Sequence, residues 1–154
     1  MKTPIEIQQI LENKFPDVQI VIEGSSLIIP KEKWFETAIF LKNAPELSFD
    51  FLSSVTGVDY KEYLEVVYHL YSMEKKEGPL NIKVRTDVEK CILPSVTPIW
   101  RSAEFQEREA YDLVGIHFEG HPDLRRILMW EGFEYHPLRK SYVQEDQDRP
   151  SDQF

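Results

Sequence analysis

The sequence contains a single cysteine, Cys91, among its 154 residues. A disulfide needs two cysteines, and an iron–sulfur cluster is usually held by four protein ligands. The chain alone therefore forms no internal disulfide and is not expected to hold a cluster. A free cysteine is most often a small buried hydrophobic residue, which is the interpretation we give to Cys91.

Long hydrophobic runs are also missing. The longest stretch without Asp, Glu, Lys or Arg has ten residues, Cys91 to Trp100, whereas a membrane-spanning helix needs about 20 apolar residues. The first residues, Met1 to Glu6, show no apolar core followed by a small-residue cleavage site, so no secretory signal is expected. These observations predict a protein on the cytosolic side that does not itself span a bilayer.

Positive charge is scarce, with 18 Lys and Arg against 27 Asp and Glu, and a net charge of −9. This balance opposes binding to the phosphate backbone of a nucleic acid. One segment departs from it, because residues 121–142 hold four basic and three acidic side chains. If a buried carboxylate elsewhere in the chain needs a positively charged partner, we expect that partner to lie in this segment.

The usual nucleotide and metal motifs are absent. No G-x-G-x-x-G occurs, so the dinucleotide fingerprint is missing. Gly115 and Gly120 have phosphate-loop spacing, but His121 and Pro122 stand where Lys and Ser or Thr are required. His117 and His121 have the i,i+4 spacing of helical metal ligands, yet the glycines and Pro122 break any helix there. Structural polar contacts are therefore the preferred interpretation of both histidines.

The composition present, 42% hydrophobic and 12% aromatic, is that of a globular chain, and the length suits one domain. Capping signals and apolar spacing predict helices over 3–15 and 31–43, with a hairpin over 18–29 between them. Strand-like runs follow at 47–58, 62–73 and 78–86, and short connections favour an antiparallel meander. The sequence predicts an α+β fold, a mostly antiparallel sheet with helices on one face.

A third helix is predicted from Thr97-Pro98 to Val114, before Gly115. Glu107 falls on its apolar stripe beside Ala103 and Ala110, and a buried, unpaired carboxylate costs several kcal/mol. Partners for Glu107 are available in the locally basic segment, and an arginine is favoured because it binds a carboxylate bidentately. The candidates are Arg125, Arg126, Arg139 and Lys140, with Arg125 or Arg126 preferred. The contact is either an internal ion pair or a docking determinant for another subunit.

Arg108 on the same helix has i,i+4 spacing to both Glu104 and Asp112, which predicts weak, solvated pairs. The opposite side of the helix, with Phe105 and Leu113, also suggests that the helix contacts something on both sides. After Gly115 the chain is expected to be an extended, loop-rich tail with an acidic end at 143–154.

One part of the sequence resembles a known family. Residues 107–116 read Glu-Arg-Glu-Ala-Tyr-Asp-Leu-Val-Gly-Ile, and after Phe118 residues 120–129 read Gly-His-Pro-Asp-Leu-Arg-Arg-Ile-Leu-Met. This run from Glu107 to Met129 resembles the signature of the 30 kDa (C) subunit of respiratory complex I, the NADH–quinone oxidoreductase.

A second segment, His136-Pro137-Leu138-Arg139-Lys140 with Tyr142, also resembles that family. The departures are Tyr135, where the family has Gly, and Ser141 and Val143, where it has Asp and Pro. The resemblance implies an α+β domain at 1–130 and an extended tail at 131–154. The residues that it marks as structural signature or subunit interface are Glu107, Arg108, Glu109, Tyr111, Asp112, His121, Pro122, Arg125, Arg126, His136, Arg139 and Lys140.

The resemblance implies a scaffold without a redox or catalytic centre of its own. Such a subunit would lie in the peripheral arm, on the cytoplasmic side of the inner membrane. It would pack on the forty-nine-kilodalton (D) subunit near the quinone site. The proton-translocating complex would use FMN, iron–sulfur clusters, NADH and quinone, none of them bound by this chain. Membrane contact would come only through the complex, and no nucleic-acid partner is implied.

Two alternatives stay open. Related subunits occur in membrane-bound hydrogenases and in ferredoxin- or F420-linked relatives of complex I, and the signature does not separate them. From a different class, a free-standing acid–base enzyme could use Glu107 and His121. Measurable turnover by the isolated chain would favour that second alternative.

Overall fold

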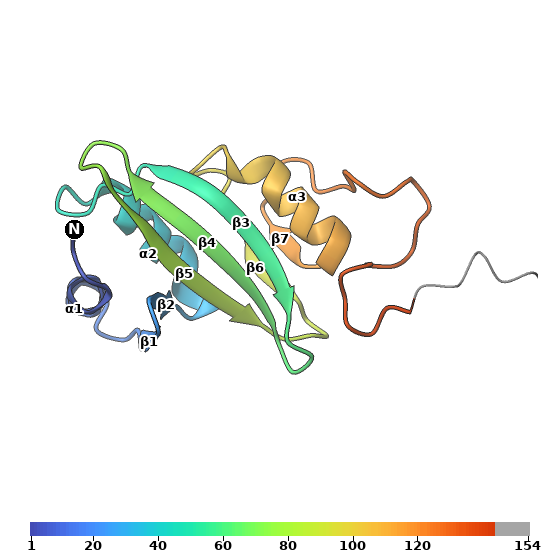
Figure 1. Cartoon of the computed structure of the whole chain (residues 1–154), viewed down its shortest axis with the longest axis horizontal. Helices are drawn as coiled ribbons and strands as arrows, with labels where there is room; N and C mark the ends of the chain where they lie inside the picture. Colours follow the sequence, from blue (N-terminus) through green and yellow to red (C-terminus); the bar gives the residue numbers. More distant parts are fainter. Residues whose placement is uncertain (144–154) are drawn as a thin grey trace, which may run out of the picture.

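Residues 1–143 are described by the structure, a computed structural model, and they fold into one main sheet, three helices and a short two-stranded sheet (Figure 1). The elements in chain order are α1 (Pro4–Lys14), β1 (Val21–Glu23), β2 (Ser26–Ile28), α2 (Lys31–Asn43), β3 (Phe51–Asp59), β4 (Leu64–Ser72), β5 (Glu77–Thr86), β6 (Ile92–Pro94), α3 (Ala103–Val114) and β7 (His117–Glu119).

The main sheet has the strand order β1-β2-β5-β4-β3. Strands β3, β4 and β5 form the antiparallel meander that the sequence predicts, and β1 and β2 form the predicted hairpin. The hairpin joins the meander through a parallel pairing of β2 with β5, which the sequence does not indicate. The α+β prediction is confirmed, and β3 is left at one edge of the sheet.

The helices pack against one face of this sheet. Trp34 of α2 lies on Tyr68 of β4, with ring centroids 4.7 Å apart. Tyr68 stands opposite Val55, and its neighbour Val66 stands opposite Gly57, so these residues point to the same face. A Cβ on Gly57 would lie 3.2 Å from Ile116 and 3.4 Å from Ala110, so glycine here permits the close approach of α3.

Helix α3 begins at Ala103, so the predicted start at Thr97 is wrong. Residues 97–102 form turns, in which the carbonyl of Val96 accepts the N–H groups of Ile99 and Trp100. The Thr97 hydroxyl lies 3.1 Å from the Glu107 carboxylate. Ten residues of continuous helix would separate these positions by about 15 Å along the axis. The contact with Glu107 therefore holds this segment beside the helix instead of at its start.

Beyond β7, residues 120–143 contain turns and bends, with no helix or strand among them. Figure 1 shows this segment leaving β7 beside the first part of α3, looping outward and returning toward the lower end of β3. We call residues 120–143 the anchored tail. The rest of the predicted tail, with the acidic residues after Val143, lies outside the described residues.

None of the helices in the described part of the chain has the length and apolar character needed to cross a membrane.

Candidate functional site

Asp112 of α3 is the centre of the contact between the helix and the anchored tail. Its side chain is fully buried, and Oδ2 accepts the backbone N–H groups of Ile127 (3.0 Å), Leu128 (2.6 Å) and Met129 (2.9 Å). Oδ1 accepts from the Arg126 guanidinium at 2.7 Å. Burial alone would raise the pKa of Asp112, but the N–H donors and Arg126 together lower it. The carboxylate therefore stays charged and holds the tail.

Arg108 lies one helical turn before Asp112, and its guanidinium binds backbone carbonyl oxygens of the tail. Nε donates to the carbonyl of Arg125 at 3.1 Å, and Nη2 donates to the carbonyl of Arg126 at 3.0 Å. Arg108 is buried, so the prediction of solvated pairs with Glu104 and Asp112 is wrong. The reason is that Arg126 occupies the Asp112 carboxylate, and the tail supplies Arg108 with two carbonyls.

The second tail segment caps the C-terminus of α3. The last carbonyls of a helix have no partner within it. Here the His136 ring donates to the Asp112 carbonyl at 2.9 Å, the Leu138 N–H donates to the Leu113 carbonyl at 2.9 Å, and Arg139 donates to the Val114 carbonyl. Cationic side chains are favoured at this negative end of the helix dipole.

Gly115 makes this capping possible. It adopts a left-handed conformation with φ of 82°, and a Cβ there would lie 2.6 Å from the His136 ring. The tail then reaches β3, where the Lys140 N–H donates to the Asp59 carboxylate at 2.8 Å. The tail is thus fixed at both the helix and the sheet.

Glu107 is buried, as predicted, but its predicted arginine partner is wrong. Its carboxylate accepts from the Ser95 hydroxyl at 2.6 Å, the Val96 N–H at 2.8 Å and the Thr97 hydroxyl at 3.1 Å. Arg126 pairs with Asp112 instead. Burial raises the pKa of Glu107 despite these hydrogen bonds. The residue holds the segment before α3 against the helix.

His121 lies next to Glu107 without forming a close pair, since Nε2 is 3.9 Å from the carboxylate. Nε2 lies 2.8 Å from the Glu104 carbonyl, and Nδ1 lies 3.0 Å from the Asp123 N–H. The carbonyl can only accept, so Nε2 donates to it, while Nδ1 accepts the Asp123 N–H. Both side chains are fully buried. A general acid or base must reach its substrate, so the geometry gives no support to an acid–base enzyme.

The remaining predicted residues lie around this contact. Tyr111 is half-buried, with its ring centroid 6.2 Å from that of His136, whereas Glu109 and Pro122 are exposed. Arg125 pairs with Asp123 at 2.8 Å on the surface. Cys91, also half-buried, has its sulfur 3.1 Å from the Gly115 carbonyl.

Sequence reasoning placed Gly115 at the end of the helix but missed its contact with His136, and it missed Asp59 and Ser95 as partners of Lys140 and Glu107. A glycine directly after a predicted helix is a signal for a left-handed cap, but nothing in the sequence connects Asp59 with Lys140. Within residues 1–143, no group of three or more His, Cys, Asp or Glu side chains is placed to bind a metal ion.

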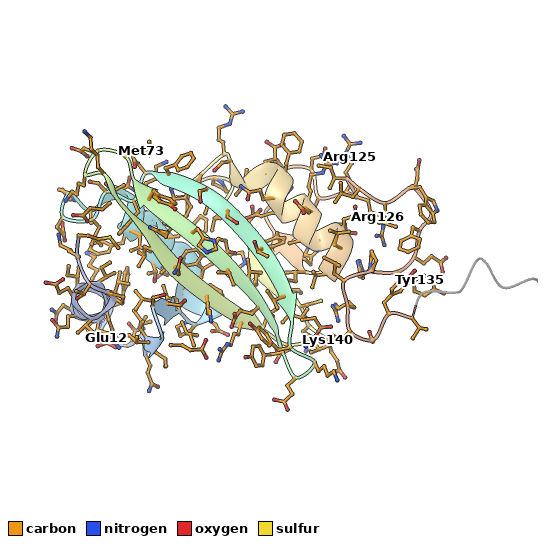
Figure 2. All side chains as sticks on the ribbon, in the orientation of Figure 1. Glu12, Met73, Arg125, Arg126, Tyr135 and Lys140 are labelled. Carbon is orange, nitrogen blue, oxygen red and sulfur yellow. The ribbon has the colours of Figure 1, made fainter. Side chains whose placement is uncertain are left out.

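The anchored tail carries large apolar side chains that point outward. Trp130 is 63% exposed and Leu128 62%, and Tyr135 lies on the outer loop in Figure 2. The others are Ile127, Leu138 and Val143. Phe133 packs on Trp130 and lies over Arg126, which stiffens the loop. The backbone of the tail is fixed, while these apolar side chains stay exposed on the described part of the chain.

Fold and contact together define an α+β domain whose last helix holds an irregular tail. Residues 27–148 match the family model described as the 30 kDa subunit of the respiratory-chain NADH dehydrogenase. The chain belongs to this family, as the signature resemblance predicts.

Curated relatives agree. The chain is 53% identical over 117 residues to the NADH-quinone oxidoreductase C 2 subunit of Rhizobium meliloti, a match that covers 74% of this chain and 63% of that protein. It is 35% identical to the NADH-quinone oxidoreductase C subunit of Chlorobium phaeobacteroides, covering 94% of this chain and 92% of the relative. The chain thus spans less than two thirds of the Rhizobium protein but nearly all of the Chlorobium one.

Two solved structures share the fold. A trypsin-resistant fragment of Nqo5 superposes with a TM-score of 0.57 at 36% identity, covering 77% of this chain and 98% of the fragment. A chain of the membrane-bound sulfane sulfur reductase, an archaeal respiratory membrane complex, gives a TM-score of 0.69 at 23% identity, covering 97% of this chain and 98% of that one. At that identity the second likeness shows the fold alone.

Proposed function

We propose that the chain is a non-redox scaffold subunit in the peripheral arm of a proton-translocating NADH–quinone oxidoreductase. In this proposal it docks on the forty-nine-kilodalton (D) subunit near the quinone site and supports electron transfer from NADH to quinone. The observation that carries the proposal is the anchored tail, whose backbone is bound to α3 while its large apolar side chains remain exposed.

Exposed apolar patches of this kind are typical of protein–protein contact surfaces. Interface energies depend most on Trp, Tyr and Arg side chains, and Trp130, Tyr135 and Arg125 lie on the tail. A tail that is already ordered loses little entropy when a partner binds, which favours tight association. Asp112 and Arg108 would thus serve docking indirectly, by presenting the tail in one conformation.

The division into a domain at 1–130 and a tail at 131–154 is part of the proposal. The fragment of Nqo5 resists trypsin, and 98% of it matches 77% of this chain. This supports a protease-resistant α+β domain in the present chain. Residues 131–154 would then become fully protected from trypsin only when they are docked on the neighbouring subunit.

The complex, and not this chain, would supply FMN, the iron–sulfur clusters and the NADH and quinone sites. The chain would lie on the cytoplasmic side of the inner membrane and touch the membrane only through its partners.

The test is purification of the native complex through a tag on this chain, with its subunits identified. Leu128→Ser combined with Trp130→Ser should reduce the amount of D subunit recovered at least about tenfold, because two buried apolar side chains contribute roughly 1.5–3 kcal/mol each. Met73→Ser is the matched control, since Met73 is as exposed as Leu128, at 62%, but lies at the far end of the sheet (Figure 2).

Recovery of the D subunit in normal amount from the double variant would contradict docking through the tail. Purification of the wild-type chain without any D subunit would overturn the proposed function itself. A nickel-binding large subunit in its place would identify the hydrogenase-type relative.

A further inference from the structure

A groove lies between β3 and α3, and the anchored tail reaches it only at Leu138. Its volume is about 270 Å³. One wall is β3 around Gly57, the other is α3 from Gln106 to Leu113, and Leu138 of the tail closes one end. The elements that form it are fixed, because Gln106 and Ser102 bond to the backbone of β3 at Val55 and Leu52.

Part of the β3 backbone faces this groove without a strand beside it. Strand β3 is the sheet edge and, within the described residues, pairs only with β4. The Val55 N–H donates to the Gln106 side chain at 2.9 Å, so Val55 turns its backbone groups away from β4. Orientation alternates along an antiparallel strand, so Gly57, two residues on, turns its N–H and C=O the same way. Thr56 and Val58 bond to β4 instead.

The groove also has a defined side-chain chemistry. Ala110 and Leu113 give the helix wall an apolar floor, and Glu109 stands at the rim. Glu109 is exposed and forms no ion pair with any residue from 1 to 143. An extended peptide segment fits all three features of the groove. Its backbone would pair with the edge of β3, an aliphatic side chain would cover the apolar floor, and a cationic side chain would pair with Glu109 at the rim.

We propose that an extended segment of a neighbouring subunit pairs with the free edge of β3 at Gly57 and runs in the groove beside α3. The segment would exchange two backbone hydrogen bonds with Gly57, place an aliphatic side chain on Ala110 and Leu113, and place a lysine or arginine against Glu109. The inference rests on the proposed function in that the chain must sit in a complex of several subunits.

Charge argues against the other possible occupants. A symmetric pair of two copies through this edge would bring two Glu109 carboxylates together without a cation. The chain's own residues 144–154 contain four acidic residues and one basic residue, a poor match to Glu109. A cationic segment from a different chain is the occupant that the groove fits.

Amide hydrogen exchange at single-residue resolution tests the inference in the isolated full chain and in the purified native complex. The Gly57 amide should exchange faster than Thr56 and Val58 in the isolated chain, because it has no strand partner. In the complex its exchange should slow at least about tenfold. Complexes carrying Glu109→Lys should lose most of this protection, whereas the matched charge reversal Glu74→Lys, on the distant β4–β5 turn, should keep it.

Equal exchange of Gly57 in the isolated chain and in the complex would overturn the inference. Protection that grows with concentration of the isolated chain would indicate a second copy, and protection lost on deleting 144–154 would indicate the chain's own end; either result contradicts it. If the D subunit is recovered while Gly57 stays unprotected, this inference fails and the proposed function stands.

Discussion

Glu107 and Asp112 are both buried on α3, but their surroundings shift their pKa values in opposite directions. Asp112 receives three backbone N–H groups and an arginine, which keep its pKa low. Glu107 accepts from two hydroxyls and one N–H, and burial raises its pKa despite these hydrogen bonds and the nearby His121 ring. The charged Asp112 carboxylate holds the anchored tail, whereas the Glu107 carboxyl group accepts hydrogen bonds from the turn that precedes α3.

This difference predicts how Glu107 responds to substitution. Glu107→Ala should lower the free energy of unfolding by about 2–4 kcal/mol, because the Ser95 hydroxyl and the Val96 N–H lose a buried acceptor. Glu107→Gln should cost about 1 kcal/mol or less, since the amide oxygen can accept from Val96 and the hydroxyls can turn to accept its N–H. Denaturant unfolding of the full chain measures both.

The pH dependence of Glu107 follows from the raised pKa. The folded protein retains the Glu107 proton above the ordinary value of 4.5, whereas the unfolded chain releases it there. The wild type should therefore lose stability relative to Glu107→Gln as the pH rises from 4.5 through the raised pKa.

Complexes with Glu107→Ala should be less abundant but turn over normally per assembled complex. Normal assembly with abolished turnover would instead place Glu107 in the reaction.

Spacing along one helix predicted that Glu107 is buried, because its apolar neighbours settle which side of the helix it is on. The same spacing misplaced Asp112, which was expected on the wetter side and is fully buried. The reason is that a tail from later in the chain covers that side, and a helical pattern contains no information about which segment crosses it. The partners of both carboxylates were therefore beyond prediction from sequence.

At the scale of the element, the C-terminal half of α3 and the anchored tail form one polar unit. Asp112→Asn should loosen the tail while leaving the sheet folded, because both carboxylate oxygens accept hydrogen bonds and an amide has one oxygen, so its NH2 group would face either Arg126 or the backbone N–H groups. Trypsin should then cut near Arg125 and Arg126 at least about tenfold faster, the factor for a loss of about 1.4 kcal/mol. Asp123→Asn, at an exposed carboxylate near the same site, is the control.

The same unit should respond to acid. The lowered pKa of Asp112 means that its contribution is present above the ordinary value of 3.8 and is lost as the pH falls through the folded value. Tail release in acid that is identical in wild type and Asp112→Asn would show that another group holds the tail.

Elements with strong local signals were predicted well. Helix α2 covers Lys31–Asn43 as expected, and in α1 Thr3 and Glu6 form the predicted capping box with Pro4 at the first helical position. Thr97-Pro98 carries the same kind of start signal for α3 but is overridden, because the Glu107 carboxylate binds this segment from the side. The parallel pairing of β2 with β5 depends on a distant contact that no local pattern specifies.

At the scale of the whole molecule, the proposed position predicts how the protein leaves the membrane. Attachment through polar and apolar contacts with other subunits should be reversed by chaotropic salt, since no described helix is suited to span the bilayer. We expect the chain to appear in the supernatant after such a wash of native membranes, detected by its tag. Retention in the bilayer fraction, with the D subunit removed, would contradict attachment through partners.

The bonds that Asp112 makes to the tail have a consequence for how the family can vary. Its carboxylate binds the backbone N–H groups of Ile127, Leu128 and Met129, which every residue except proline provides. The side chains at these three positions can therefore change without weakening the anchor. A lineage whose neighbouring subunit acquires a new surface could adjust its own contact residues one substitution at a time, while the fold that presents them stays the same.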